Sequence, residues 1–161
     1  MKEEANTMKD RFVAHGSLVV GLLLAVVILS GASRPPIEDR VPEARSEQAK
    51  ALQAPFGDTR TAAADVVAAG KDLYDGKGQC ALCHGANGKG DGPASLMQAN
   101  HPPRNFTDCA FQKERHDGEL FWVIKYGSPG TSMPALIPHI LSEEEGWKLV
   151  AYLRTFCKAG E

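Results

Sequence analysis

The sequence has 161 residues, enough for one domain with additional segments but too few for two ordinary domains. Hydrophobic residues account for 43% and charged residues for 24%, which is typical of a globular chain and excludes an intrinsically disordered one. The formal net charge of −2 excludes a strongly basic nucleic-acid-binding protein, and four cysteines are too few for a disulfide-dense miniature fold.

The N-terminal region changes character at residue 12. Residues 1–11 are polar and carry both signs of charge, whereas residues 12–31 contain no Asp, Glu, Lys or Arg. A helix of this length measures about 30 Å, the thickness of the hydrocarbon core of a bilayer. We therefore predict a single transmembrane anchor over residues 12–32, with residues 1–11 in the cytoplasm. A cleaved signal peptide is the alternative, because small residues suited to cleavage follow the apolar run. Both interpretations place the rest of the chain in the periplasm or an equivalent extracytoplasmic space.

Residues 33–60 are rich in proline and charge and contain few large apolar side chains. Because proline lacks an amide donor and interrupts regular structure, this stretch is poor material for a core. We predict a linker, either a flexible tether or an ordered strap packed on a partner subunit, with a short helix possible over residues 43–53. The folded domain is then expected over residues 61–161.

The first helix of the domain is expected over residues 62–75, where apolar residues recur at the spacing of one helix face. Gly70 lies on that face. Because glycine in a helix interior costs about 1 kcal/mol relative to alanine, Gly70 indicates either the close approach of a second helix or a neutral surface position.

Two further helices are predicted nearer the C-terminus. One covers residues 118–126, with Asp117 as its N-cap and Gly127 as its stop. The other begins with a capping box at Ser142 and ends near residue 156. No stretch of the domain alternates as a half-buried strand would, so the predicted fold class is all-α.

The sequence Cys80-x-x-Cys83-His84 carries the main chemical signal. It is the attachment signature of c-type haem, in which each cysteine thiol joins one vinyl group and the histidine ligates the iron. One alternative is a four-thiolate zinc site with Cys109 and Cys157, although these two are too far apart in the chain for a second CxxC. A thioredoxin-like dithiol is the other alternative, but no strand–helix–strand pattern surrounds the motif. The glycine-rich loop that follows, residues 85–93, lacks the Gly-Lys-Ser/Thr ending of a phosphate-binding loop.

Met133 is the favoured second ligand of the iron. It lies in a loop rich in glycine and proline, which offers a methionine no regular face to bury but could hold its thioether against iron. Met97 has no comparable constraint and is expected to serve packing. The remaining histidines lie in polar or proline-rich segments and are weaker candidates, and an open sixth position is a further alternative; these histidines are His101, His116 and His139.

Residues 62–157 resemble a class I monohaem cytochrome c. The resemblance rests on the segments 69–74, 80–84, 117–121, 130–134 and 150–153 and on the Gly-x-Gly-Asp-Gly-Pro stretch after the attachment motif. It implies a small fold of three to five helices around one haem c, with the first and last helices crossing at Gly70, Tyr74 and Tyr152. It also implies axial ligation by His84 and Met133 and one-electron transfer through an exposed haem edge. Such a protein is a carrier and not itself an enzyme.

The function expected from these features is electron transfer between respiratory-chain partners at the outer face of the membrane, with redox proteins as partners and no nucleic acid or small-molecule substrate. A fixed haem subunit of a larger oxidoreductase complex is the main alternative, and a catalytic or gas-sensing haem domain is a third. Cys109 and Cys157 are not part of the haem motif. In an oxidising compartment a remaining pair usually bonds, so we predict a disulfide, with two buried free thiols as the alternative.

Overall fold

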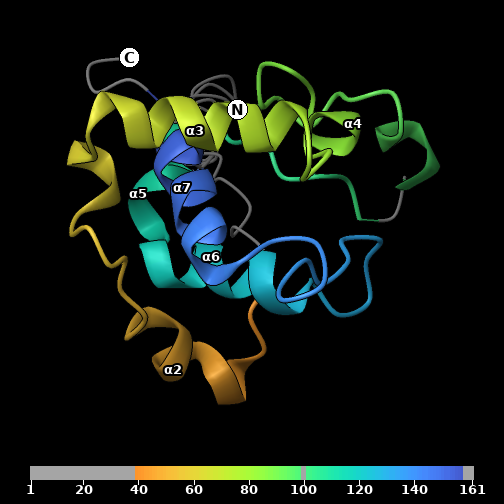
Figure 1. Ribbon diagram of the computed structural model, residues 1–161. Coiled ribbons are helices and arrows are strands. Elements are labelled where there is room, and N and C mark those ends of the chain that lie inside the picture. The colour runs from red at the N-terminus through yellow and green to blue at the C-terminus, as the bar shows by residue number, and fades with distance from the viewer. Residues whose placement is uncertain (1–38, 99–100, 158–161) are drawn as a thin grey trace, which may run out of the picture. The chain divides into compact units, whose positions relative to one another are not determined.

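The computed structural model describes residues 39–98 and 101–157 (Figure 1). No strand occurs in these residues, so the all-helical prediction is confirmed for them. The anchor predicted over residues 12–32 lies outside the described residues, and within them no helix is long and apolar enough to cross a bilayer. The elements, of which η1–η3 are 3₁₀ helices, are η1 (Glu43–Arg45), α2 (Ser46–Lys50), η2 (Thr59–Thr61), α3 (Ala64–Asp75), α4 (Ala81–His84), η3 (Ser95–Gln98), α5 (Cys109–Glu114), α6 (Asp117–Tyr126) and α7 (Glu143–Arg154).

The crossing of α3 and α7 is the principal helix contact of the domain (Figure 1). Gly70 lies at the crossing, where a Cβ atom would stand 2.1 Å from the Lys148 carbonyl oxygen. Glycine is therefore required by the close approach of the two backbones, which decides between the two interpretations of this residue. One turn later the ring of the fully buried Tyr74 lies 5.3 Å from that of Tyr152. The crossing expected near these residues is confirmed.

The ends of α6 and α7 follow from short-range hydrogen bonding. Helix α7 begins at the predicted capping box, in which Ser142 Oγ accepts from the Glu145 amide and the Glu145 carboxylate accepts from the Ser142 amide. Helix α6 ends at Gly127, whose φ of 77° is accessible to glycine at little cost. Its N-cap is His116 and not Asp117, because Glu119 accepts from the His116 amide and shifts the start of the helix by one residue.

Residues 39–52, which we call the N-terminal strap, pack on α6. Val41 and Ala49 are buried against Trp122, and Gly118 allows the strap backbone to approach so closely that a Cβ there would stand 2.0 Å from the Ala49 carbonyl oxygen. Helix α2 therefore lies inside the segment expected to be a linker, and the folded unit extends upstream of residue 61.

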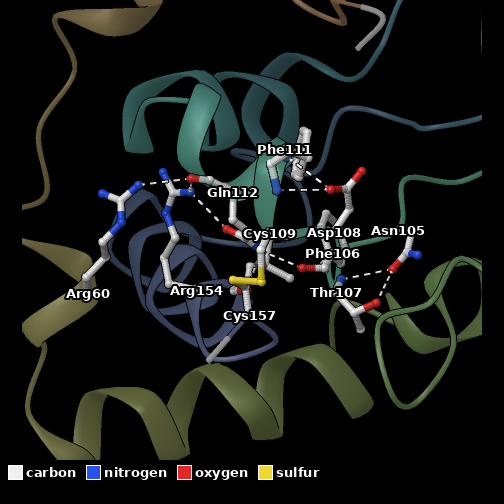
Figure 2. The surroundings of a disulfide bond; sticks show 12 residues. Arg60, Asn105, Phe106, Thr107, Asp108, Cys109, Phe111, Gln112, Arg154 and Cys157 are labelled. Atoms are coloured by element: carbon white, nitrogen blue, oxygen red, sulfur yellow. Dashed lines mark hydrogen bonds between the residues drawn. A yellow bond between two sulfur atoms is a disulfide. The ribbon is translucent and has the colours of Figure 1, made fainter. Parts of the chain in front are cut away.

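A buried polar cluster joins α7 to α5 and α6, and Figure 2 shows its bonds between Arg154 and Gln112. The side chain of Arg154, 6% exposed, donates to the Gln112 carbonyl oxygen and side chain, to the Arg115 carbonyl oxygen and to Asp117. Arg154 thus donates hydrogen bonds to carbonyl groups at the C-terminal end of α5, which have no donor within the helix itself. The cluster fixes α5 against α7 beside the Cys109–Cys157 pair.

Candidate functional site

The turn carrying the attachment motif is fixed to α3 and to the loop that follows it. Cys80 is the N-cap of α4, and its amide donates to the Tyr74 carbonyl oxygen at 2.9 Å. The Tyr74 hydroxyl donates to the Gly85 carbonyl oxygen at 2.7 Å, at the other end of the turn. Both ends of the motif are therefore held by one buried tyrosine of α3.

The two motif cysteines differ in their surroundings. Cys83 lines a cavity, whereas Cys80 is not among the residues lining it and its Sγ lies toward Gly78. Burial raises the pKa of the Cys80 thiol to about 12, so this thiol is protonated at neutral pH. Both thiols lie in one helical turn beside the cavity, and neither is in a disulfide.

His84 presents one nitrogen for ligation. Its Nδ1 lies 3.0 Å from the carbonyl oxygen of Arg104, and because a carbonyl only accepts, Nδ1 carries the proton and Nε2 keeps its lone pair. Burial holds the pKa of the imidazole below its ordinary value, which favours the neutral form that metals bind. The ring is stacked on Phe106, with centroids 4.5 Å apart, so its orientation is set from two directions.

Met133 is held by a hydrogen-bonded loop that follows α6. Its amide donates to the Thr131 hydroxyl at 3.1 Å, and its carbonyl oxygen accepts from the Ser128 amide at 3.1 Å. The Thr131 hydroxyl in turn donates to the Ser128 carbonyl oxygen. Beyond the loop the Leu136 amide donates to the Ile124 carbonyl oxygen of α6. The position of Met133 is thus determined by backbone contacts of the loop itself.

Cys83, His84 and Met133 line one cavity, which has a volume of about 120 Å³ and is partly open to solvent. Most of the remaining wall surface is apolar, as a porphyrin face requires; its apolar residues are Val41, Pro102, Pro103, Phe106, Phe111, Leu120, Val123, Ile124, Pro134 and Leu153. The buried Ser128 hydroxyl in the same wall has no hydrogen-bond partner among the described residues. The apolar wall, the neutral imidazole and the thioether together fit a haem.

A model of the family described as cytochrome c matches residues 67–156, more than half of the chain. The chain belongs to the cytochrome c family. Membership implies a covalently bound haem c and a role in electron transfer, and Cys80, Cys83 and His84 occupy the attachment pattern. No curated protein matches the chain.

Among solved structures, the cytochrome c domain is similar to a chain of the Kuenenia stuttgartiensis reducing HAO-like protein complex Kustc0457/Kustc0458. The two share 28% sequence identity with a TM-score of 0.55, and the match covers 68% of this chain. It covers 49% of the other chain, so this protein spans about half the length of its structural relative.

The structure joins Cys109 and Cys157 in a disulfide, with Cα atoms 5.3 Å apart (Figure 2). A four-thiolate zinc site would need both of these sulfurs, so this alternative loses two of its ligands. Within the described residues no group of three or more His, Cys, Asp or Glu side chains is placed to hold a metal ion. The disulfide lies between the first residue of α5 and the segment after α7, next to the Arg154 cluster.

Of the other candidate iron ligands, some line the cavity and others lie elsewhere. His101 also lines the cavity of the cytochrome c domain, whereas His116 caps α6 and His139 is exposed outside it. The side chain of Met97 lies outside the described part of the structure. His101 is therefore the histidine against which Met133 has to be tested.

Sequence reasoning missed three charged cavity residues: Arg40 of the strap, Arg115 at the C-terminal end of α5 and Glu119 of α6. Charged side chains in a proline-rich segment or at a helix start are usually solvent-exposed, so composition gave no signal for them. Only the burial of Glu119, which is 3% exposed, distinguishes it from an ordinary surface residue.

Proposed function

We propose that this cytochrome c is a one-electron carrier whose haem c is attached through Cys80 and Cys83 and ligated by His84 and Met133. The observation that carries the proposal is that Cys83, His84 and Met133, from segments about 50 residues apart, line the same cavity. When bound, haem supplies an iron that changes oxidation state by one electron. Two strong protein ligands leave no position for a substrate, which favours electron transfer over bond chemistry.

The residues of this chain hold the two proposed iron ligands in position and surround them with an apolar wall that excludes water. The Arg104 carbonyl oxygen orients His84, and the Thr131 and Ser128 contacts orient Met133, so both ligand positions are set before any iron bond forms. A thioether ligand in an apolar wall favours ferrous iron and raises the reduction potential. The domain is therefore suited to accept electrons from a donor of lower potential and pass them on.

We propose further that residues 12–32 anchor the protein in the cytoplasmic membrane, with residues 33–38 leading to the cytochrome domain on the outer side. The apolar run in the sequence supports the anchor, and the disulfide supports an oxidising compartment. Mass spectrometry of the mature protein tests the anchor. An intact N-terminus supports it, and a chain beginning at Ser33 would show a cleaved signal peptide instead.

A fixed subunit of a larger redox complex is the second candidate, favoured by the similarity to a chain of the HAO-like protein complex. Copurification in mild detergent separates the two. A carrier is recovered alone, whereas a fixed subunit is recovered with stoichiometric partner chains. A gas-binding or catalytic domain would need an open iron position, so rapid carbon monoxide binding by the ferrous protein at neutral pH would favour that function.

The ligand assignment is tested by Met133→Ala, with His101→Ala as the matched control in the same cavity. Met133→Ala should retain covalent haem but lower the reduction potential and abolish the weak sulfur-to-iron band at the red end of the spectrum. His101→Ala should leave both unchanged. A wild type without the sulfur-to-iron band, whose spectrum is changed by His101→Ala and not by Met133→Ala, would assign the sixth position to His101. In Cys80→Ala/Cys83→Ala, absence of covalent haem is expected, and a wild-type protein that contains zinc and no covalent haem would refute haem attachment.

A further inference from the structure

Residues 103–106, which we call the proximal segment, supply the carbonyl oxygen and the ring that orient His84. The Arg104 carbonyl oxygen lies 3.0 Å from His84 Nδ1, and the Phe106 ring is stacked on the imidazole. A histidine that donates its second N–H to a carbonyl group is a more basic ligand for a metal. The position of the proximal segment therefore bears on the electron density that His84 can give to an iron, and not only on the orientation of its ring.

The proximal segment belongs to no helix, so its position depends on contacts with other segments. One side of it lies against the glycine-rich loop that follows His84. The Phe106 amide donates to the Gly88 carbonyl oxygen at 2.6 Å, and a Cβ at Gly90 would stand 2.5 Å from the Pro103 carbonyl oxygen. This side of the segment is thus fixed by the same loop that carries the chain away from the attachment motif.

Gln112 of α5 holds the other side of the proximal segment. Its side-chain amide donates to the carbonyl oxygens of Phe106 and Leu153, each at 2.9 Å (Figure 2). Its side-chain oxygen accepts from Arg154 at 2.8 Å. Gln112 is 5% exposed, and both the donor and the acceptor end of its amide are engaged. The Phe106 carbonyl is therefore fastened to the junction of α5 and α7.

The ring and the backbone of Phe106 are held by different kinds of contact. The ring packs on Phe156 and Phe111, with centroids 6.2 and 6.3 Å away. Apolar packing of this kind is not directional, whereas a hydrogen bond weakens steeply with distance and angle. The Gln112 bond is therefore the contact from α5 that fixes the backbone of the segment, and the Arg104 carbonyl lies only two residues before it.

We propose that Gln112 is a positioning residue that sets the reduction potential through the proximal segment. By holding the Phe106 carbonyl, it keeps the Arg104 carbonyl oxygen in bonding distance of His84 Nδ1. The inference rests on the proposed function and deepens it, since it presupposes an iron ligated by His84. Without the Gln112 bonds the hydrogen bond at Nδ1 weakens and the imidazole becomes a poorer electron donor. Ferric iron is then less stabilised, so the reduction potential rises.

The test compares Gln112→Met with Thr59→Val in the full-length haem-loaded protein. Methionine is similar in length to glutamine but has no amide, so it removes the bond to Phe106 while largely filling the site. Thr59 is a matched control, because it is 1% exposed and bonds Asp117 of the same polar cluster at 2.6 Å, without a hydrogen bond to the proximal segment among the contacts resolved. Its substitution therefore loosens the cluster alone.

Gln112→Met should raise the reduction potential and speed the exchange with solvent of the His84 Nδ1 proton, which NMR follows in the ferrous protein. Thr59→Val should lower the free energy of unfolding but leave both of these quantities at their wild-type values. The direction is opposite to that of Met133→Ala, which should lower the potential. The proton exchange rate is the reading that a merely structural role of Gln112 would not change.

A Gln112→Met protein with covalent haem, a wild-type potential and wild-type exchange of the Nδ1 proton would overturn the inference and leave the proposed function standing. Equal changes in Gln112→Met and Thr59→Val would also overturn it, because they would indicate a general loosening of the cluster.

If Gln112→Met does not fold, Gln112→Glu takes its place. Its carboxylate keeps an oxygen for Arg154 but has no proton to donate to the Phe106 carbonyl. Faster exchange of the Nδ1 proton in this variant supports the inference, and unchanged exchange overturns it. A wild-type protein that lacks covalent haem, or whose His84 does not bind the iron, would instead contradict the proposed function itself.

Discussion

The Cys109–Cys157 disulfide closes a loop of 48 positions that contains α6, the Met133 loop and all of α7. In the chain-entropy account of cross-links, a loop of this length lowers the entropy of the unfolded chain by an amount worth about 4 kcal/mol at 25 °C. The native packing of α5 on α7 has an independent support, because Arg154 binds the Gln112 and Arg115 carbonyl oxygens beside the disulfide. Replacing both cysteines by serine should therefore leave the native structure intact and act through the unfolded state.

We expect Cys109→Ser/Cys157→Ser to lower the free energy of unfolding by up to about 4 kcal/mol, measured by guanidinium titration of the haem-loaded protein. The visible spectrum and reduction potential of the folded variant should match those of the wild type. Wild-type protein reduced at both sulfurs serves as the control, and its unfolding should coincide with that of the variant. A loss below about 1 kcal/mol would refute the loop-entropy reasoning, and a changed potential would show that the disulfide shapes the cavity itself.

Two further substitutions probe the helix contacts. Gly70→Ala places a methyl group against the backbone of α7. The overpacking should cost about 1–3 kcal/mol, which outweighs the gain of about 1 kcal/mol in helix propensity. The melting temperature should therefore fall, and a rise would contradict the close crossing of the two helices. Burial would raise the pKa of Asp117, but bonds from Thr59 and Arg154 lower it overall. Its carboxylate therefore stabilises the fold above its unfolded pKa of about 3.9, and this contribution is lost as the pH falls through the lower folded value. Asp117→Asn should reduce stability at pH 7 and flatten the acid limb of the stability profile, and parallel profiles for the two proteins would refute this role.

The parts of the fold that the sequence predicted are those with strong local signals. The capping box at Ser142 and the stop at Gly127 mark helix ends through hydrogen bonds within one turn, which need no knowledge of the rest of the chain. The attachment motif is equally local, because two thiols and an imidazole share a single turn. For the role of Gly70 the sequence left two alternatives, close packing of a second helix or a neutral surface position, because the approach of α7 is a long-range contact.

The packing of the strap on α6 and the Arg154 cluster could not be predicted, for the same physical reason, although the sequence allowed a short helix over residues 43–53 and a strap packed on a partner subunit. The buried strap residues Val41 and Ala49 are small and isolated between charges, so they produce no periodic pattern, and their burial depends on the space left by Gly118. Arg154, at the end of an amphipathic helix, has the sequence context of a surface residue. Its burial is compensated by acceptors that lie about 40 positions earlier in the chain, which no local window includes.

Both proposed iron ligands lie outside long helices, and their positions depend on hydrogen bonds that do not involve iron. The turn that carries His84 is tied to α3 by the Tyr74 hydroxyl, and the Met133 loop is closed by Ser128 and Thr131. A rigid scaffold that holds short functional loops keeps a ligand in place in both oxidation states. It also means that removing the Met133 thioether takes away the proposed ligand without removing the contacts that shape the loop. Substitution at Met133 consequently reports on ligation and not on folding, and a spectrum unchanged by that substitution would leave the sixth ligand to another cavity residue.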